Sequence, residues 1–284
     1  MKKILGITGS RRILGNCEIM AKEISANIRV PHELQLVCLP EFEVLPCKAC
    51  YACLFKEQRC VQKDDFNQIL DLMTGADALI VAVPTYFLGA SSSLKRLLDR
   101  GLAFYGGLED LWGKPAVGVG IAGIEGMEGY TSLNVESFLK LAFFDLKGCE
   151  IVYGALPGEI FLNEENRLLA VKLAEALFGE ALTKSVPSCP LCNGDTFRFI
   201  GDNRVRCMLC SNEGTMDVSS GNPVFDVVSG EHHLFLTKEG ALSHLEWLRG
   251  MKQRYMDERA SLKKITQPYR GRDNRVKPEA AVKG

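Results

Sequence analysis

The sequence predicts an α/β protein: a doubly wound domain with a five-stranded parallel sheet over residues 1–183, then a small cysteine-rich metal ribbon and a helix. Short, almost wholly apolar runs alternate with helix-like segments along the first part of the chain. Strands that are apolar throughout suit a parallel sheet with helices on both faces. Two CxxC motifs follow where this alternation ends, so we expect a second unit held by a metal.

The individual elements follow from the apolar runs and from the helical spacing of apolar residues. The predicted strands are 4–8, 34–39, 78–83, 116–121 and 150–156. The predicted helices are 17–28, 65–73, 92–103, 132–146 and 164–182. Each gap between strands is long enough for the crossover helix that a parallel connection requires.

Beyond residue 183 the composition changes at a proline-containing stretch. The predicted segments are a zinc-ribbon-like segment over 184–230, a helical region over 231–265 and a basic flexible tail over 266–284. In the helical region an apolar stripe is expected to pack against a neighbouring element: Leu245, Leu248, Met251 and Tyr255. The tail is interrupted by prolines and poor in large apolar residues, which is typical of a mobile segment.

Composition narrows the class of protein. Of 284 residues, 46% are hydrophobic and 24% charged, and the formal net charge is -1. This charge creates no large field for a polyanion, so nucleic acid is disfavoured as a partner and no membrane is expected. The first apolar run stops at Gly9, short of a signal peptide, and no run approaches the roughly 18 apolar residues of a membrane span. We expect a soluble, cytoplasmic protein whose eleven cysteines ligate metal rather than form disulfides.

The first predicted strand runs into a glycine-bearing loop, Gly9 to Cys17, which opens directly into a helix. Backbone N–H groups of such a loop and of a helix N-terminus converge on an anion. Ser10, Arg12 and Asn16 can add side-chain donors. This loop after the first strand contains neither GxGxxG nor GxxxxGKS/T, which disfavours a nicotinamide-type dinucleotide domain and a P-loop NTPase. The loop therefore predicts a phosphate site, with an ordinary strand–helix turn as the alternative.

A second loop at the same crevice follows the third predicted strand. In an open parallel sheet, ligands lie outside the carboxyl ends of strands where the strand order reverses. The chain leaves the third strand through Pro84, Thr85, Tyr86 and Phe87, whose two aromatic rings offer surface to a flat ring. After the fourth strand, Gly123 allows such a ring to approach closely. Packing in a turn or in the core is the alternative role for these aromatic side chains.

Three segments resemble the NADPH-dependent FMN reductase superfamily: GSRRILGN, then CKACYACLFKEQRCVQKDD, then ADALIVAVPTYF with LKRLLDR. Within that superfamily they are similar to the iron-sulfur flavoproteins, over about the first 155 to 180 residues. The resemblance implies a flavodoxin-like fold that binds FMN. It also implies that the FMN phosphate lies at Ser10, Arg12, Gly15 and Asn16, with residues 84–87 near the isoalloxazine ring.

Two residues depart from the pattern of the superfamily. Arg11 stands where the superfamily usually has proline, and Cys17 stands where it usually has serine or threonine. A thiol is a poorer hydrogen-bond donor than a hydroxyl. Cys17 is therefore a weaker candidate for a phosphate donor than the usual serine or threonine.

A second motif is a quartet of closely spaced cysteines: Cys47, Cys50, Cys53 and Cys60. Three thiolates two residues apart can wrap one face of a cubane and a fourth can close it, which is how one loop holds a 4Fe-4S cluster. Zinc and free thiols are the alternatives, but zinc sites usually join two distant CxxC pairs. Asp64, just after the quartet, is expected to cap the next helix. Cys38 and Cys149 fall in apolar runs and are interpreted as core residues.

The C-terminal quartet has a different spacing. Cys189, Cys192, Cys207 and Cys210 form two CxxC pairs separated by fourteen residues, which predicts a tetrathiolate metal ribbon. Iron in a rubredoxin-like site is the alternative to zinc. Rubredoxin knuckles usually carry glycine after the second cysteine, whereas Asn193 and Ser211 stand there in this chain, so zinc is favoured.

Together, the motifs and the resemblance favour an FMN-dependent oxidoreductase that couples one-electron cluster transfer to two-electron flavin chemistry. The alternatives are an NAD(P)H-dependent FMN, quinone or metal reductase without a cluster, and a redox-sensing or interaction protein that uses the ribbon. Expected partners are redox donors or acceptors such as ferredoxin, NAD(P)H or quinone. No side chain is assigned as catalytic acid or base. Because subunits of iron-sulfur flavoproteins associate with one chain's cluster beside another's FMN, the resemblance implies a homodimer or homotetramer.

Overall fold

The computed structural model describes residues 1–55 and 58–271. The chain forms two compact units, Met1–Leu245 and a second unit that begins at Glu246. Most of the predicted tail, residues 272–284, lies outside the described residues. Within 1–55 and 58–271, no helix has the length and apolar character needed to cross a membrane.

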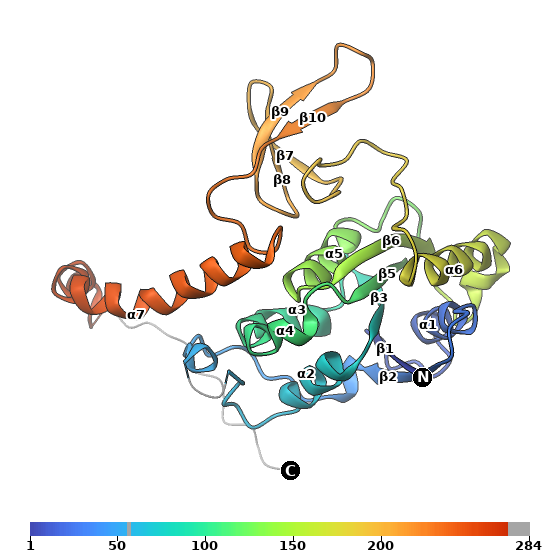
Figure 1. Ribbon diagram of the computed structural model, residues 1–284, viewed down its shortest axis with the longest axis horizontal. Helices are drawn as coiled ribbons and strands as arrows, with labels where there is room; N and C mark the ends of the chain where they lie inside the picture. Colours follow the sequence, from blue (N-terminus) through green and yellow to red (C-terminus); the bar gives the residue numbers. More distant parts are fainter. Residues whose placement is uncertain (56–57, 272–284) are drawn as a thin grey trace. The chain divides into compact units, whose positions relative to one another are not determined.

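The centre of the larger unit is a parallel sheet whose strand order reverses at β1 (Figure 1). In spatial order the parallel strands are β2 (His32–Cys38), β1 (Lys2–Thr8), β3 (Ala78–Tyr86), β5 (Pro115–Ala122) and β6 (Asp145–Tyr153). A two-residue strand, β4 (Gly89–Ala90), pairs antiparallel with the end of β3. The prediction of a doubly wound, five-stranded parallel sheet is confirmed, with β4 as an addition.

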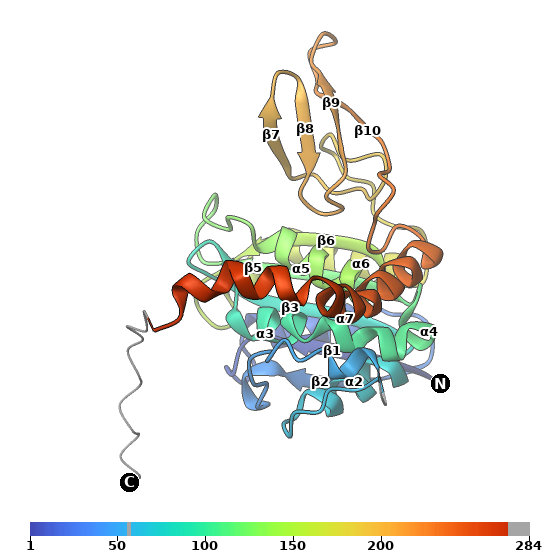
Figure 2. The same ribbon diagram turned by 90° about the vertical axis from the view of Figure 1, so that its left-hand side faces the viewer.

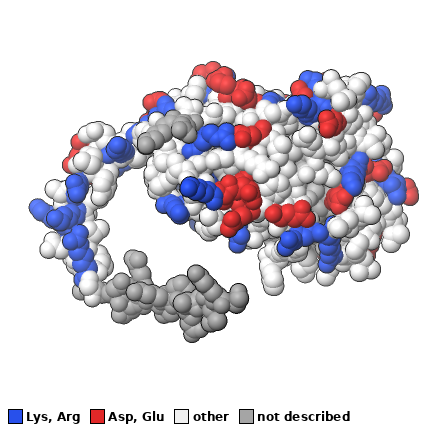
Figure 3. All heavy atoms as spheres, turned by 90° about the horizontal axis from the view of Figure 1, so that it is seen from below, with Lys and Arg blue, Asp and Glu red and all other residues white. Residues whose placement is uncertain are grey.

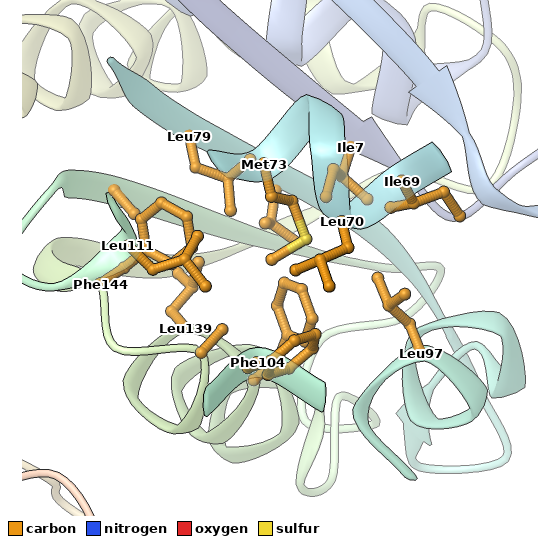
Figure 4. Close-up of a cluster of buried hydrophobic side chains, with 14 of the residues drawn as sticks. Ile7, Ile69, Leu70, Met73, Leu79, Leu97, Phe104, Leu111, Leu139 and Phe144 are labelled. Carbon is orange, nitrogen blue, oxygen red and sulfur yellow. The ribbon is translucent and has the colours of Figure 1, made fainter. Parts of the chain in front are cut away.

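Helices cover both faces of this sheet (Figure 1). One face packs against α1 (Asn16–Ala26) and α6 (Glu164–Leu177). The other face packs against α2 (Phe66–Gly75), α3 (Ser92–Asp99), α4 (Leu108–Leu111) and α5 (Thr131–Leu141). Figure 4 shows the second core, where Met73, Leu97 and Leu139 converge from three of these helices. Strands buried on both faces explain why the sequence shows continuous apolar runs rather than alternation.

Three predicted helices run four or five residues beyond the observed ones and are wrong at their C-terminal ends, and the one predicted over 164–182 stops at Leu177. The helix predicted over 132–146 stops at Leu141, because Phe143 takes a left-handed backbone (φ 69°) and the chain turns into β6 at Asp145. The helix predicted over 92–103 stops at Asp99 and continues as a 3-10 helix, η3 (Gly101–Gly107). In the last two places, apolar residues continue at helical spacing past the true end because they pack into the same core.

The cysteine-rich segment forms a four-stranded antiparallel sheet within the larger unit (Figure 2). Its spatial order is β10 (Val224–Val227), β9 (Glu213–Asp217), β8 (Arg204–Cys207) and β7 (Phe197–Gly201). Helix α7 (Lys238–Thr266) follows and ends in the short 3-10 helix η5 (Gln267–Tyr269). The ribbon and the C-terminal helix predicted from the sequence are therefore both present.

The apolar stripe predicted on α7 is only partly buried. Leu245 and Leu248 are buried, whereas Tyr255 is exposed. Three further 3-10 helices lie in connecting segments: η1 (Leu39–Glu41), η2 (Ala52–Leu54) and η4 (Glu159–Leu162). On the face of the larger unit drawn in Figure 3, described acidic and basic side chains are mixed, as the near-neutral net charge predicts.

Candidate functional site

The loop after β1 passes so close to β3 that it requires glycine. The Gly9 N–H donates to the Ala82 carbonyl at 3.0 Å. A Cβ atom on Gly9 would lie 2.6 Å from Ser91 Oγ and 2.9 Å from Pro84 Cδ. Gly15 closes the turn before α1, because its N–H donates to the Arg12 carbonyl at 2.9 Å. The loop is thus held at the carboxyl end of the sheet by backbone contacts that a larger residue would break.

The N-terminus of α1 has the properties of an anion site. Its N-cap residue is Gly15, which offers no side-chain cap to the first-turn N–H groups. Glu18 instead accepts a hydrogen bond from the Leu14 N–H at 2.8 Å, one residue before the cap. Uncapped N–H groups and the positive end of the helix dipole stabilise a phosphate that binds at the N-terminus.

Two of the predicted phosphate donors have different roles in the structure. Asn16 is buried, and both ends of its amide are engaged: Nδ2 donates to the Gly154 carbonyl and Oδ1 accepts from the Gly158 N–H, each at 2.9 Å. Asn16 therefore ties the loop to the segment after β6. Arg12 is exposed, and within the described residues its guanidinium donates one hydrogen bond, from Nη1 to the Ala155 carbonyl at 3.2 Å. The other N–H groups of the guanidinium can therefore bind a ligand.

A cavity of about 570 Å³ opens beside this loop, which is within the usual size range of small-molecule sites. It brings together Ser10, Arg12 and Tyr86 of the predicted site. Gly9 and Arg11, from the same predicted phosphate loop, also line it. The remaining lining residues were not predicted: Leu39, Pro40, Phe42, Val44, Ser91, Ser92, Ser93 and Arg96. Three arginines and four serines line it without an acidic side chain, which favours an anionic ligand.

The serines at the start of α3 have a recognisable signal in the sequence. Ser91, Ser92 and Ser93 follow the third strand, and Arg96 comes about one helical turn later. Hydroxyls at a helix N-terminus followed by a basic residue are typical of an anion site. The wall formed by residues 39–44 has no such signal, because only the folded chain brings the end of β2 beside β1.

The other predicted ring residues lie at the same edge of the sheet but do not line this cavity. Pro84 and Thr85 are half-buried at the end of β3, and Gly123 is exposed after β5. Phe87 is fully exposed at the first position of the β3–β4 turn. Its φ of 49°, and 67° at Leu88, give the turn positive φ at both central residues. Left-handed backbone at non-glycine residues costs roughly 1–2 kcal/mol each.

Two cysteines flank the phosphate loop. Cys17 is buried, and desolvation raises its pKa to about 12, so the thiol stays protonated. Cys38 was predicted as a core residue, but it is half-buried and its thiol donates to the Ser10 carbonyl at 3.1 Å. That interpretation of Cys38 is wrong, because the residue ends β2 and leans over the loop instead of pointing into a core. Cys149 is buried, as predicted.

The first cysteine quartet lies on one loop between β2 and α2, which we call the cysteine loop (residues 45–64). Residues 56–57 of it lie outside the described chain. Cys47 and Cys50 are exposed, and Cys53 and Cys60 are half-buried. Left-handed backbone at Ala49 and Tyr51, with φ of 50° and 57°, turns the chain between successive cysteines.

The spacing of these thiols suits a cluster better than a single ion. The pKa of Cys53 is raised to about 11, first by burial and then by the charges of Cys60, Cys50 and Cys47. The four side chains are therefore close enough to interact. Among the described His, Cys, Asp and Glu side chains, however, the ribbon cysteines are the only group of three or more whose ligand atoms all lie within 4.8 Å of one another. In a four-iron cluster each thiolate binds a different iron, so the thiols lie farther apart than around one ion.

Hydrogen bonds close the base of the cysteine loop. The Leu45 N–H donates to Asp64 Oδ2 at 2.9 Å, and Gln62 Nε2 donates to the Pro46 carbonyl at 3.1 Å. Asp64 was predicted to be the N-cap of the next helix, but the N-cap is Asp65. Asp64 lies one residue earlier, where its carboxylate joins the two ends of the loop.

The ribbon quartet forms a compact tetrathiolate. All four cysteines are buried, with Sγ–Sγ distances of 3.9 Å for Cys189–Cys210 and 3.5 Å for Cys192–Cys207. A tetrahedral ion with metal–sulfur bonds of about 2.3 Å has edges of about 3.8 Å. The neighbouring thiols lower the pKa of Cys210 and raise that of Cys192 far above its ordinary value. Four such thiols can all ionise only around a cation.

The two CxxC turns of the ribbon have the same backbone. Asn193 N–H donates to the Cys189 carbonyl and Ser211 N–H to the Cys207 carbonyl, each at 2.9 Å. Asn193 and Ser211 both take left-handed φ, 63° and 62°. This conformation explains the usual glycine at these positions, and the knuckle forms here without it. A tetrahedral set of four sulfurs accepts either zinc or iron.

Comparison with known proteins agrees with this fold. Residues 2–147 match the family model described as NADPH-dependent FMN reductase. The solved structure of a flavone reductase superposes with a TM-score of 0.76 and 20% identity, covering 98% of this chain and 100% of that one. At this identity the likeness shows the fold alone.

Three curated relatives share the name iron-sulfur flavoprotein. One from Archaeoglobus fulgidus is 38% identical over 101 residues, which are 34% of this chain and 48% of that protein. One from Methanosarcina thermophila is 42% identical over 102 residues, 34% of this chain and 51% of that protein. Against these two, this chain spans about half the length of the relative. A second protein from Archaeoglobus fulgidus is 30% identical over 181 residues, 61% of this chain and 80% of that protein.

Proposed function

Because the chain belongs to the iron-sulfur flavoproteins of the NADPH-dependent FMN reductase family, we propose that it is a flavin-dependent oxidoreductase that moves electrons between FMN and an iron-sulfur cluster. One observation carries the proposal. The wall of the cavity formed by residues 39–44 leads into the cysteine loop, and Cys47 follows Val44 by three residues. The candidate flavin cavity and the cluster loop are thus built from one continuous segment.

In this proposal the FMN phosphate binds at the loop from Ser10 to Gly15 and the N-terminus of α1, with Arg12 as its charged partner. Asn16 holds the loop, and the ring lies near residues 84–87 and Gly123. FMN exchanges one or two electrons and a cluster exchanges one, so the pair would connect two-electron partners such as NAD(P)H or quinone to one-electron carriers such as ferredoxin. The side chains of this chain bind and orient the groups that carry the electrons.

We also propose the identity of the metal groups. Cys47, Cys50, Cys53 and Cys60 hold one 4Fe-4S cluster, because their spacing exceeds that of a single tetrahedral ion. Cys189, Cys192, Cys207 and Cys210 hold one zinc ion, because they form a closed, fully buried site without an open position. All eleven cysteines are unpaired thiols, which suits the reducing cytoplasm.

Replacing Arg12 with glutamine tests the phosphate site. A charge-assisted hydrogen bond contributes about 1.5–3 kcal/mol, so FMN affinity is expected to fall roughly 10- to 100-fold. The measurement is the dissociation constant of FMN by quenching of flavin fluorescence. Arg29→Gln is the control, since Arg29 is exposed and pairs with Glu175 away from the cavity. Unchanged affinity in Arg12→Gln would place the phosphate elsewhere.

We propose that the protein is a homodimer or homotetramer in which the cluster of one chain lies beside the flavin of another. Large apolar side chains are exposed on the loops after four parallel strands, at the edge where the flavin is proposed: Ile13, Leu14, Phe87, Leu88, Ile124, Met127 and Leu156. A cluster of exposed apolar side chains is typical of an interface. A second copy would bury them with closed symmetry.

Hybrids of two variants test this assembly. Mixing cluster-free Cys53→Ser chains with chains of a variant that cannot bind FMN is expected to restore electron transfer between the two centres, followed by stopped-flow absorbance. Neither variant should show it alone. A native protein that sediments as a monomer and still exchanges electrons between its own centres contradicts the arrangement.

A further inference from the structure

A buried ion pair joins the two ends of the cysteine loop. Arg100, at the C-cap of α3, has 1% of its side chain exposed, and Asp64 has 0%. Arg100 Nη1 donates to Asp64 Oδ2 at 2.6 Å and to the Leu45 carbonyl at 2.9 Å, and Nη2 donates to Asp64 Oδ1 at 3.2 Å. Leu45 precedes Cys47 by two residues, and Asp64 follows Cys60 by four. The guanidinium therefore lies where the chain enters and leaves the loop.

Closing the loop does not by itself require a buried arginine. The Asp64 carboxylate accepts hydrogen bonds from the N–H groups of Leu45 and Phe66, at 2.9 and 3.3 Å. A second tie links Glu43 and Asp65 through two hydrogen bonds of 2.7 and 2.9 Å. Buried ion pairs are often no more stabilising than apolar side chains of the same volume. The position of Arg100 therefore points to a role beyond mechanical closure.

Arg100 has hydrogen-bonding capacity that Asp64 and Leu45 do not use. Its Nε is buried and has no hydrogen-bond partner within the described part of the chain. Burial alone would lower the pKa of Arg100, but the Asp64 carboxylate and the neighbouring Cys60 thiol outweigh it and raise that pKa. The guanidinium carbon lies 4.5 Å from the centre of the Phe66 ring, which shields it from water. A cation that is shielded in this way acts strongly on a neighbouring thiolate.

The backbone of Cys60 is fixed relative to this cation. The side chain of Asn67 accepts a hydrogen bond from the Cys60 N–H at 3.2 Å and donates to the Cys60 carbonyl at 2.7 Å. Helix α2 carries Asn67 and begins at Phe66, immediately after Asp64 and Asp65. The cysteine and its cationic neighbour are thus held by the same short segment.

We propose that Arg100 is a positioning residue for the cluster, donating an N–H to the Cys60 sulfur and thereby making the cluster easier to reduce. Hydrogen bonds to the sulfurs and local charge are two of the factors that set cluster potentials. The inference rests on the proposed cluster in the cysteine loop. It adds a residue outside the four ligands that determines the direction in which electrons flow.

The test compares the reduction potential of the cluster in the native protein, in Arg100→Gln and in the control Lys95→Gln. Lys95 lies on the same helix, is exposed and pairs with Asp99, so the control loses the same charge away from the loop. The proteins are purified anaerobically, assayed for iron and acid-labile sulfide, and titrated with dithionite while EPR follows the cluster. Arg100→Gln is expected to shift the equilibrium about tenfold towards the oxidised form, or about 59 mV for a one-electron couple. The control should shift less than about twofold, since exposed charges are screened by water.

Each outcome decides the proposal. A fully loaded Arg100→Gln variant at the native potential overturns it. If that variant does not load, the double variant Asp64→Asn with Arg100→Gln leaves no unpaired buried charge and is titrated in its place. Its expected shift is in the same direction but smaller, because the two paired charges leave together and only the N–H donor to Cys60 is lost. If neither loads while Lys95→Gln does, Arg100 serves the folding of the loop and the tuning role is wrong. Native protein without acid-labile sulfide refutes the proposed cluster itself, and this inference with it.

Discussion

Replacing Cys53 with serine is expected to remove the iron-sulfur cluster while FMN and the ribbon metal remain. Cys53 is the third cysteine of the quartet, and the charges of the other three thiols act on it. Serine leaves three thiolates and a hydroxyl that ionises far less readily, so the cluster loses one of its four attachments. Iron and acid-labile sulfide should fall to the background level, and cluster absorbance should disappear.

The measurement is metal and sulfide content per chain after anaerobic purification. Cys38→Ser is the matched control, since Cys38 is also half-buried but donates to the Ser10 carbonyl outside the quartet. It should keep the full cluster. Native sulfide content in Cys53→Ser, or loss of zinc instead of iron, would show that the cysteine loop has been assigned the wrong metal group.

Replacing Cys207 with alanine should empty the ribbon site and unfold the four strands β7 to β10. Cys207 is completely buried at the end of β8, and its Sγ lies 3.5 Å from that of Cys192. Structural zinc sites contribute about 10–16 kcal/mol of apparent binding free energy, which is also folding free energy. The small core around these cysteines is too limited to replace that contribution.

Two readouts separate the ribbon from the rest of the chain. Amide hydrogen exchange should become fast over β7 to β10 in Cys207→Ala, while the amides of β1, β3 and β5 stay protected. Zinc and iron analysis identifies the metal that is lost, and the sulfide content should not change. Met208→Ala is the control, because Met208 lies in the same knuckle but is exposed. Protection of β7 to β10 in a metal-free Cys207→Ala variant would contradict a metal-dependent ribbon.

Most of the fold could be predicted because its signals are local. The three central strands β1, β3 and β5 are apolar on both faces, and the spacing of the two CxxC pairs by itself indicates the ribbon. Helix ends were less predictable. Apolar residues such as Phe144 continue the helical spacing beyond α5, but the left-handed turn at Phe143 has already redirected the chain.

The residues of the candidate site likewise fall into those that could be predicted from local sequence and those that could not. Ser10 and Arg12 lie in a loop contiguous in sequence, and the loop thiols are close together along the chain, so their chemistry could be recognised before the structure. Ser91 and the apolar wall at Leu39 come from segments far apart in sequence. Only the pairing of β1 with both β2 and β3 brings them to one cavity.

The sequence by itself identified the residues whose chemistry suits a cofactor or a metal: a candidate phosphate loop, four thiols on one loop and four in a ribbon. The tertiary structure decided which of the polar side chains are available to a ligand and which hold segments of the chain together. Asn16 resembles a phosphate donor in the sequence, yet its side-chain amide is hydrogen-bonded to the backbone of Gly154 and Gly158. Arg100 is one more charged residue at the end of a helix, yet it is buried against Asp64 beside Cys60. A buried polar group must find partners, and those partners come from segments that only folding brings together.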